Sequence, residues 1–540
     1  MPGVASAGTF VWSSNTDGLW TDTTKWTYVP GSGPSGAGYP TNPGDVALLG
    51  DETTIFSANR TITIPNDVHI TVGSIGMKSN VAFTILAGGA NSRIDFENSN
   101  GLTGTFISKE RSTTGNDEIA VPIRLLGRLR VTVTSSTNHI TLSGVIGEAG
   151  GSRALTKAGP GALYLRSLGN LFTGATTVEE GVLALDGATP AILGNITVGN
   201  GNAADGTARL FVKRPEQIAD FANVQVNADS DLLVEAEERI AGLTVNGGSV
   251  LVTGNGPFGP GILTLSSLTM AGGVVDTSGI GKLRLEGDLT ATSNAQGPAI
   301  VRRADNNSTG TLDLVGAAHV FAVSQGPSAV RDLDFSLPLV ETGSAGLTKD
   351  GAGRMRFFGE VSNKYTGVTV VRQGRLELAK SPSTVSVPGS LQIGAGAGPV
   401  VVELSEAHNI NQNATVSVSD ASTFILNGDQ VLGGLGVGSG SLVQVGLTKE
   451  IGARASNLTI AGGRVVVVKA SSTFHAETSI VATSTAGRPA TIEGPGRFAM
   501  VGAIPMFVLD GPEAIDLLIA AQWSASADDG RITKRDPGVA

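Results

Sequence analysis

The sequence contains no cysteine, and only 5% of its 540 residues are aromatic. The absence of cysteine excludes disulfide bonds and cysteine-based metal sites. Lysine and arginine are scattered and the net charge is −10, so we expect no nucleic-acid partner, because nucleic acid requires clustered positive charge. No apolar run is long enough for a membrane-spanning helix, and we therefore expect no membrane span.

Glycine, by contrast, is abundant, with 75 residues, and 40% of all residues are hydrophobic. Short runs alternate polar and apolar side chains between Gly, Asn, Asp or Ser; examples are Thr61–Ile64, His69–Val72 and Arg130–Val133. Alternation with a period of two is typical of β-strands, and no long window sustains the helical period. The pattern predicts an all-β chain of short strands joined by tight turns.

One stretch occurs twice. Residues 155–185 read LTKAGPGALYLRSLGNLFTGATTVEEGVLAL, and residues 347–378 read LTKDGAGRMRFFGEVSNKYTGVTVVRQGRLEL. The second copy begins 192 residues after the first, and weaker matches keep step between them, for example Leu268–Gly273 with Leu458–Gly463. Self-similarity at a long period indicates a repeat architecture, here with modules of about 190 residues.

The repeat predicts how the chain is divided. We expect a Trp- and Pro-rich N-terminal cap, the end of a degenerate module, two full modules, and the start of a further one, at residues 1–50, 51–154, 155–346, 347–531 and 532–540. The last segment begins ITKRDPG and stops within the motif. An uncovered final rung predicts either a fragment of a longer protein or self-association that covers this end.

The N-terminal segment contains three of the four tryptophans, Trp12, Trp20 and Trp26. Large aromatic side chains can cover the first rung of a solenoid, which makes this segment a predicted cap. The alternative is a platform of exposed rings, in which these three residues are candidate glycan contacts.

Two glycines follow Val-x-x at the same position of the two copies, Gly181 and Gly374. Only glycine tolerates a positive φ or a very close backbone approach. We therefore predict that both are structural corner residues.

Sandwiches, propellers and solenoids all have short strands with regular turns. Here the motif GGxVxV recurs, as in Gly248–Val252 and Gly462–Val466, and no linker separates the modules. Equivalent corners without linkers favour a β-solenoid, in which each turn pairs with the next.

The repeated stretch resembles the autotransporter-associated, or passenger-associated, β-strand repeat. That pattern has a Leu-Thr-Lys-x-Gly-x-Gly-x-Leu start, an aromatic-Thr-Gly corner and a final Gly-x-Leu-x-Leu; the second copy departs from it at Met355 and Val370. The resemblance implies a right-handed parallel β-helix in an adhesin-like protein at the cell surface or outside the cell. It implies no catalytic residues.

No constellation of catalytic or metal-binding residues is evident. The five histidines, His69, His139, His319, His408 and His475, are not at metal-ligand spacing. We expect no cofactor, with calcium at 95–98 or 305–307 as the alternative, because both stretches are rich in oxygen ligands. The densest acidic group, Glu235, Glu237 and Glu238, is interpreted as a solvated turn rather than as the carboxylates of a polysaccharide-cleaving site.

These observations favour a structural or interaction protein, an adhesin-like surface fibre that is not an enzyme and contacts a glycan or receptor. One alternative is a virion component, a phage tail fibre or decoration protein. This alternative would explain why the N-terminus, MPGVASAGTFVW, lacks the features of a signal peptide. The other alternative is a carbohydrate-active β-helix enzyme, because this fold also hosts lyases and hydrolases.

Overall fold

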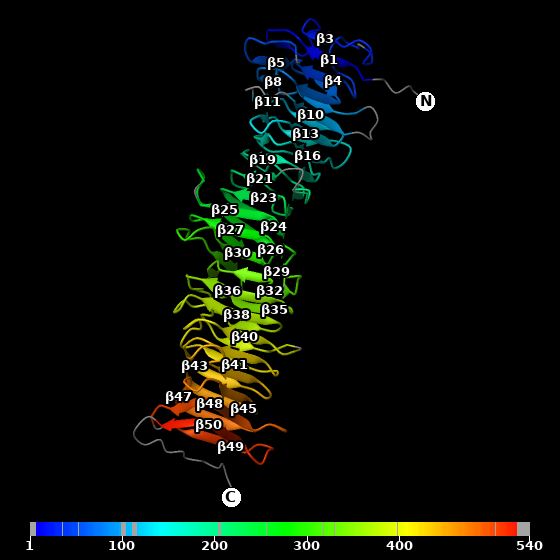
Figure 1. Ribbon diagram of the computed structural model, residues 1–540. Helices are drawn as coiled ribbons and strands as arrows, with labels where there is room; N and C mark the ends of the chain where they lie inside the picture. The colour runs from blue at the N-terminus through cyan, green and yellow to red at the C-terminus, as the bar shows by residue number, and fades with distance from the viewer. Residues whose placement is uncertain are drawn as a thin grey trace. The chain divides into compact units, whose positions relative to one another are not determined.

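The computed structural model describes residues 7–34, 36–51, 53–98, 104–110, 116–188, 190–202, 207–254, 256–316, 318–328, 330–396, 398–502 and 504–525. The chain forms β-strands and turns, and no helix occurs in these ranges, which confirms the all-β prediction. It divides into two compact units: unit 1 comprises residues 1–265 and 276–282, and unit 2 comprises residues 266–275 and 283–540. Within each unit the strands lie side by side in successive turns (Figure 1).

The strands of unit 1 are β1 (Thr9–Trp12), β2 (Gly18–Leu19), β3 (Trp26–Tyr28), β4 (Val46–Leu49), β5 (Arg60–Ile64), β6 (His69–Val72), β7 (Ser74–Met77), β8 (Phe83–Ala87), β9 (Arg93–Phe96), β10 (Thr105–Lys109), β11 (Asp117–Ile119), β12 (Ile123–Leu125), β13 (Leu129–Val133), β14 (His139–Leu142), β15 (Ile146–Glu148), β16 (Leu155–Ala158), β17 (Ala162–Leu165), β18 (Thr176–Val178), β19 (Gly181–Leu185), β20 (Ile196–Val198), β21 (Ala208–Val212), β22 (Asn223–Asn227), β23 (Ser230–Val234), β24 (Glu237–Asn246) and β25 (Ser249–Thr253). The boundary between the units runs through β26 (Ile262–Ala271), β27 (Val274–Ser278) and β28 (Lys282–Leu285).

Unit 2 continues with β29 (Leu289–Thr292), β30 (Ala299–Arg303), β31 (Leu312–Val315), β32 (Ala318–Ser324), β33 (Leu333–Phe335), β34 (Leu339–Thr342), β35 (Gly346–Asp350), β36 (Arg354–Gly359), β37 (Thr369–Val371), β38 (Arg375–Lys380), β39 (Leu391–Ile393), β40 (Val401–Leu404), β41 (Thr415–Val418), β42 (Thr423–Leu426), β43 (Gln430–Val437), β44 (Leu442–Val445), β45 (Gly452–Ala461), β46 (Arg464–Val467), β47 (Thr473–Thr483), β48 (Ala490–Met500), β49 (Met506–Leu509) and β50 (Leu517–Ala525).

Parallel pairing between successive turns builds unit 1. Its earlier turns add strands to the ladders β4–β7–β10–β13–β16 and β5–β8–β11–β14–β17 and to a separate sheet, β6–β9–β12–β15. From β16 onward two ladders continue, β16–β18–β20–β22–β24 and β17–β19–β21–β23–β25. A chain whose turns pair in this way is a parallel β-solenoid, as the sequence predicts.

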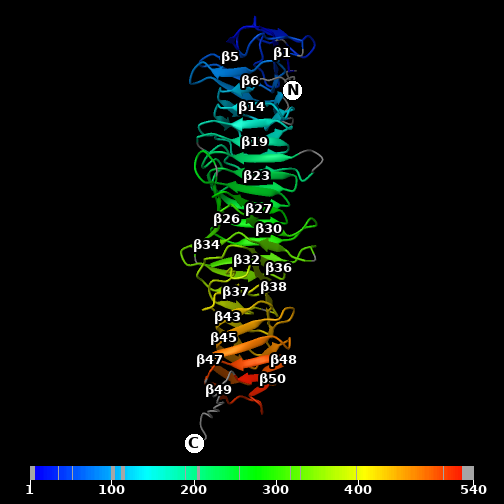
Figure 2. The same ribbon diagram turned by 60° about the vertical axis from the view of Figure 1, so that its left-hand side comes forward.

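Unit 2 follows the same principle. One ladder runs from β29 through β32, β35, β37, β39, β41, β43, β45 and β47 to β49. The other runs from β30 through β33, β36, β38, β40, β42, β44, β46 and β48 to β50. Figure 2 shows these strands following one another from β30 to β50.

Columns of aliphatic side chains form the core. Leu163 lies opposite Leu183, which is followed by Leu210 and Leu232 on the next two strands. All four are at most 1% exposed, and a fully buried leucine contributes about 1.5–3 kcal/mol to stability. Identical side chains stacking on one another fill the interior, which explains how a chain with few aromatic residues builds a core.

Candidate functional site

The lysine of the first repeat copy bonds to backbone carbonyl groups. Lys157 follows Leu155 and Thr156 on β16, and its side chain is 0% exposed. Its Nζ donates to the carbonyl oxygens of Ala158 at 2.9 Å, Gly159 at 2.6 Å and Glu180 at 3.0 Å. Because Glu180 belongs to the next turn, a single ammonium group joins the corners of two successive turns.

Lys349 makes the same contacts in the second copy. Its Nζ donates to the carbonyl oxygens of Asp350 at 3.2 Å, of Gly351, and of Gln373 at 2.9 Å in the next turn. Burial lowers the pKa of Lys157 to about 7 and that of Lys349 to about 8. Both amines are surrounded by carbonyl acceptors and so connect the corners of successive turns.

The corner glycines have the conformation that the sequence predicts. Gly181 has a φ of +69° and Gly374 a φ of +70°. A Cβ on Gly181 would lie 2.4 Å from the carbonyl oxygens of Gly159 and Gly161, and one on Gly374 would lie 2.5 Å from that of Gly353. Both the positive φ and the close approach of the preceding turn therefore require glycine.

A buried asparagine is a repeat residue that the sequence reasoning missed. Asn170 accepts a hydrogen bond from Ile146 N at 2.9 Å and donates one to Ala191 O at 2.8 Å, so it links the turns before and after its own. Asn363 does the same with Leu339 N at 3.1 Å and Ser386 O at 2.7 Å. The signal was present: each asparagine lies two residues before the aromatic residue of the aromatic-Thr-Gly corner.

Glu238 occupies a related position in a later turn and corrects the interpretation of the acidic group. Its carboxylate is 1% exposed and accepts hydrogen bonds from Gln217 N at 2.8 Å and Ile218 N at 3.1 Å. Burial raises its pKa to about 8. Glu237 is exposed and Glu235 half-buried, so the three residues do not form one solvated turn. Gln430 lies at the equivalent position in unit 2, where its Oε1 accepts from Ile410 N at 3.1 Å and its Nε2 donates to Ile410 O at 2.9 Å.

The three N-terminal tryptophans lie in the interior of unit 1. Trp12, Trp20 and Trp26 are 0%, 0% and 6% exposed. The ring of Trp26 lies edge-on to Trp12 with centroids 5.3 Å apart, and its centroid is 5.0 Å from that of Trp20. The indole nitrogens of Trp20 and Trp26 donate to Pro40 O and Trp20 O. Rings packed against one another offer no exposed platform, so these residues are not the predicted glycan contacts; their role as a cap stays a prediction.

The oxygen-rich stretches have other partners. The carboxylate of Asp95 is buried and accepts hydrogen bonds from Arg93 Nε at 2.9 Å and Arg124 Nε at 3.0 Å, which disfavours calcium at 95–98. Asp305 Oδ1 accepts from Asn307 N at 2.9 Å, the hydrogen bond of an Asx turn. Within the described parts of the chain, no three His, Asp or Glu side chains are grouped closely enough to hold a metal ion.

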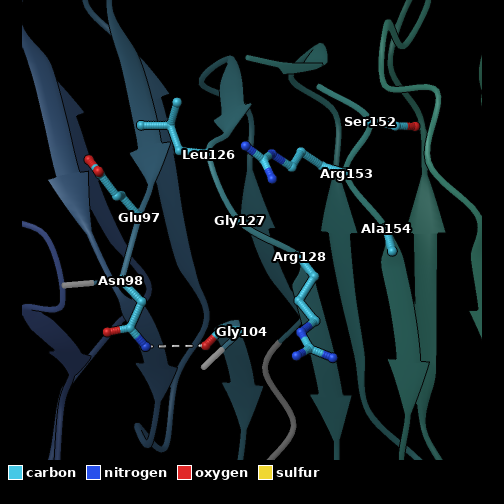
Figure 3. Close-up of a pocket in the computed structure, with 9 residues that line it drawn as sticks. All are labelled: Glu97, Asn98, Gly104, Leu126, Gly127, Arg128, Ser152, Arg153 and Ala154. Atoms are coloured by element: carbon cyan, nitrogen blue, oxygen red, sulfur yellow. Dashed lines mark hydrogen bonds between the residues drawn. The ribbon is translucent and has the colours of Figure 1, made fainter. Parts of the chain in front are cut away.

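A surface groove of about 310 Å³ lies in unit 1 where three successive turns run side by side (Figure 3). It is lined by Glu97, Asn98, Gly104, Leu126, Gly127, Arg128, Ser152, Arg153 and Ala154. Arg153 is turned toward its own loop, donating to Ala149 O at 3.2 Å and Gly150 O at 3.1 Å. Its described lining offers hydrogen-bonding groups and charge, and the hydroxyl of Ser152 bonds with that of Thr173 at 2.9 Å.

Comparison with known families matches two segments, residues 155–185 and 347–378, to the passenger-associated-transport-repeat. Comparison with curated proteins and with solved structures found no match. The matched segments contain the clamping lysines, the corner glycines and the buried asparagines. No helix in the described ranges has the length and hydrophobicity to cross a membrane. The chain therefore carries two passenger-associated-transport repeats on a parallel β-solenoid, the architecture of an autotransporter passenger-like structural domain.

Proposed function

We propose that the chain is a non-catalytic, adhesin-like domain that is displayed on the cell surface. The observation that supports this proposal is the set of contacts made by the residues that the two repeat copies share. Lysine, glycine and asparagine of the motif all contact backbone groups of neighbouring turns. These positions build the solenoid, and the outward-facing positions between them remain available for contact with partners.

The match to the passenger-associated-transport-repeat supports a location at the surface or outside the cell. A solenoid exposes long, regular faces relative to its core, and such faces suit contacts with extended partners. The corners that the two repeat copies share maintain the fold, and the outward faces bind.

The adhesin role is tested by displaying the chain on the surface of a bacterium. The chain is fused to a transport unit, its exposure is measured with an antibody, and binding of the cells to host cells or glycan-coated surfaces is counted. Cells that display the chain should adhere more than cells with the transport unit alone. Cells that display it at full level without added adhesion would contradict the adhesin role.

A second assay tests whether the protein cleaves polysaccharides. Purified protein is incubated with neutral and acidic polysaccharides, and new reducing ends and unsaturated products are measured. We expect none above a buffer control. Any sustained release of product would favour the carbohydrate-active enzyme, and labelling of phage particles by an antibody to the chain would favour the virion component.

A further inference from the structure

An outward-facing group of aromatic and basic side chains lies on three successive strands of unit 1. We name it the Arg166 cluster; its members are Tyr164, Arg166, Asp186, Phe211, Lys213 and Arg214. Tyr164 and Phe211 lie in one column of the sheet, separated by the fully buried Ala184. The cluster therefore spans β17, β19 and β21 and the turns that follow them.

The cations are held in position from two sides. Asp186, which is 11% exposed, pairs with Arg166 Nε at 3.0 Å and Arg214 Nε at 2.9 Å, and lies 3.9 Å from Lys213 Nζ. The guanidinium of Arg166 lies over the Tyr164 ring, with Cζ 4.9 Å from the centroid, and Lys213 Nζ is 5.5 Å from that of Phe211. Cation–π contacts and a shared carboxylate thus orient the charges.

Three cations share one carboxylate, so the cluster has an excess of positive charge on a chain whose net charge is −10. The side chains of Arg166 and Arg214 are 46% and 40% exposed, which leaves them accessible to a partner. Local excess charge that is both oriented and exposed is a surface prepared for an anion.

The second repeat copy provides an internal comparison. When Gly181 is set equivalent to Gly374, the strand registers make Tyr164 equivalent to Arg356 and Phe211 equivalent to Glu403. Three residues further along, Arg214 is equivalent to Glu406. There each cation has a carboxylate partner: Arg356 and Arg331 contact Asp334, Arg331 also contacts Glu377, Arg375 pairs with Glu403, and Lys449 pairs with Glu406. The core pattern is shared by both copies, so the excess of cations in unit 1 is a property of its surface and not a requirement of the fold.

We propose that the Arg166 cluster binds an acidic polysaccharide, a uronate- or sulfate-bearing chain. The cations pair with its anionic groups. The half-buried rings of Tyr164 and Phe211 hold these cations in place, and contact the sugar units through the ring surface that Arg166, Lys213 and His139 leave open. These rings are two strand spacings apart, about 9.6 Å, which matches a ligand that repeats along its length. Backbone groups of β17, β19 and β21 are already paired within the sheet, so an acidic peptide could not add as a strand here.

This inference rests on the proposed surface role, and its test is independent of surface display. Binding of polygalacturonate to the purified protein is measured by calorimetry at low and high salt. The triple variant Arg166→Gln/Lys213→Gln/Arg214→Gln should bind at least about tenfold more weakly and lose most of its salt dependence. Tyr164→Ala/Phe211→Ala keeps all the charges and should also bind several-fold more weakly.

The control makes the same change of charge in unit 2, at Lys449, Arg454 and Arg464, whose side chains are 52%, 51% and 56% exposed. This control triple variant should bind within about twofold of the unmodified protein, and thermal unfolding should show that both triple variants are folded. Equal losses in both, no loss in the Arg166 variant, or equal competition by polyglutamate would overturn the proposal. A chain that is displayed and adheres, but does not bind polygalacturonate, would overturn only this inference.

Discussion

At the scale of single residues, a few interior polar groups and glycines explain why the repeat motif has its composition. Lys157 donates to three carbonyl groups that are buried or partly buried, and Asn170 satisfies one donor and one acceptor in the turns on either side. Buried polar backbone groups are costly when they are unpaired. The motif therefore repeats the residues that satisfy its corners as well as those that fill its core.

Gly181 provides the first prediction. Gly181→Val should lower the free energy of unfolding by roughly 1–3 kcal/mol, because valine at positive φ is strained and its Cβ would meet the carbonyl oxygens of the preceding turn. Urea denaturation measures the change. Gly201→Val is the matched control, since Gly201 has a φ of +80° with no atom within 4 Å of the added Cβ. Equal effects of the two substitutions would show that the close contact contributes nothing.

Glu238 provides a pH prediction. Its pKa is raised by burial to about 8, so the folded chain holds this proton more tightly than the unfolded chain, in which a glutamate has a pKa near 4.5. The stability it contributes is fully present below about pH 4.5 and is lost as the pH rises through about 8. Glu238→Gln, the residue type at position 430, should remove this loss.

The measurement is the difference between the unfolding free energies of the unmodified protein and of Glu238→Gln across this pH window. We expect it to change by roughly 2–4 kcal/mol in favour of the variant at the alkaline end. Lys157 and Lys349 act in the opposite sense, because burial lowers their pKa values to about 7 and about 8 and stability rises with pH above them. The two lysines are present in both the unmodified protein and Glu238→Gln, so their contribution cancels in the difference. A difference in unfolding free energy that does not change with pH would contradict the prediction.

At the scale of elements, the first strands of unit 1 differ from the later ones. β1 pairs antiparallel with β3 and parallel with β4, so the N-terminal segment is joined to the first parallel pair. The three tryptophans pack together in this region, each almost fully buried. We expect this element to act as the cap that covers the first turn.

Replacing one ring tests the cap. Trp26→Ala removes contacts to both Trp12 and Trp20 and should cost about 3–5 kcal/mol, with earlier proteolysis of the N-terminal segment. Leu19→Ala serves as control, because Leu19 is 47% exposed in the same region. Limited proteolysis followed by mass spectrometry locates the change. If the N-terminal segment of Trp26→Ala resists proteolysis as well as that of the unmodified protein, the three tryptophan rings do not stabilise this segment.

At the scale of the whole molecule, each repeat copy has its partners within its own unit. The carbonyl groups that bind Lys157 lie in unit 1, and those that bind Lys349 lie in unit 2. Substitutions that share no partner usually have additive effects on stability.

Lys157→Met and Lys349→Met should each lower the free energy of unfolding by roughly 1–3 kcal/mol, because each removes the lysine donor from three buried or partly buried carbonyl groups. The double variant should show the sum within about 0.5 kcal/mol. Denaturation of the three variants at one pH measures both quantities. A double variant no less stable than either single variant would mean that unfolding of one unit already limits the stability of the chain.

Much of the fold could be predicted because its signals are local. Alternating apolar residues predict strands, and the recurrence of residues 155–185 as a similar stretch at 347–378 predicts a solenoid; both are confirmed. The positive φ of Gly181 and Gly374 also followed from their shared place in the motif. In each case the responsible physical constraint acts over a few residues, so the sequence pattern records it directly.

The sequence by itself determined that this protein is an all-β solenoid with glycine at its corners, because strand alternation and turn geometry depend on adjacent residues. Only the tertiary structure decided that Trp12, Trp20 and Trp26 are buried, that Glu238 is enclosed, and that Arg166, Asp186 and Arg214 meet on one face. Those outcomes depend on which residues become neighbours in adjacent turns. Loops of unequal length set that register, and the pattern within a strand contains no record of it.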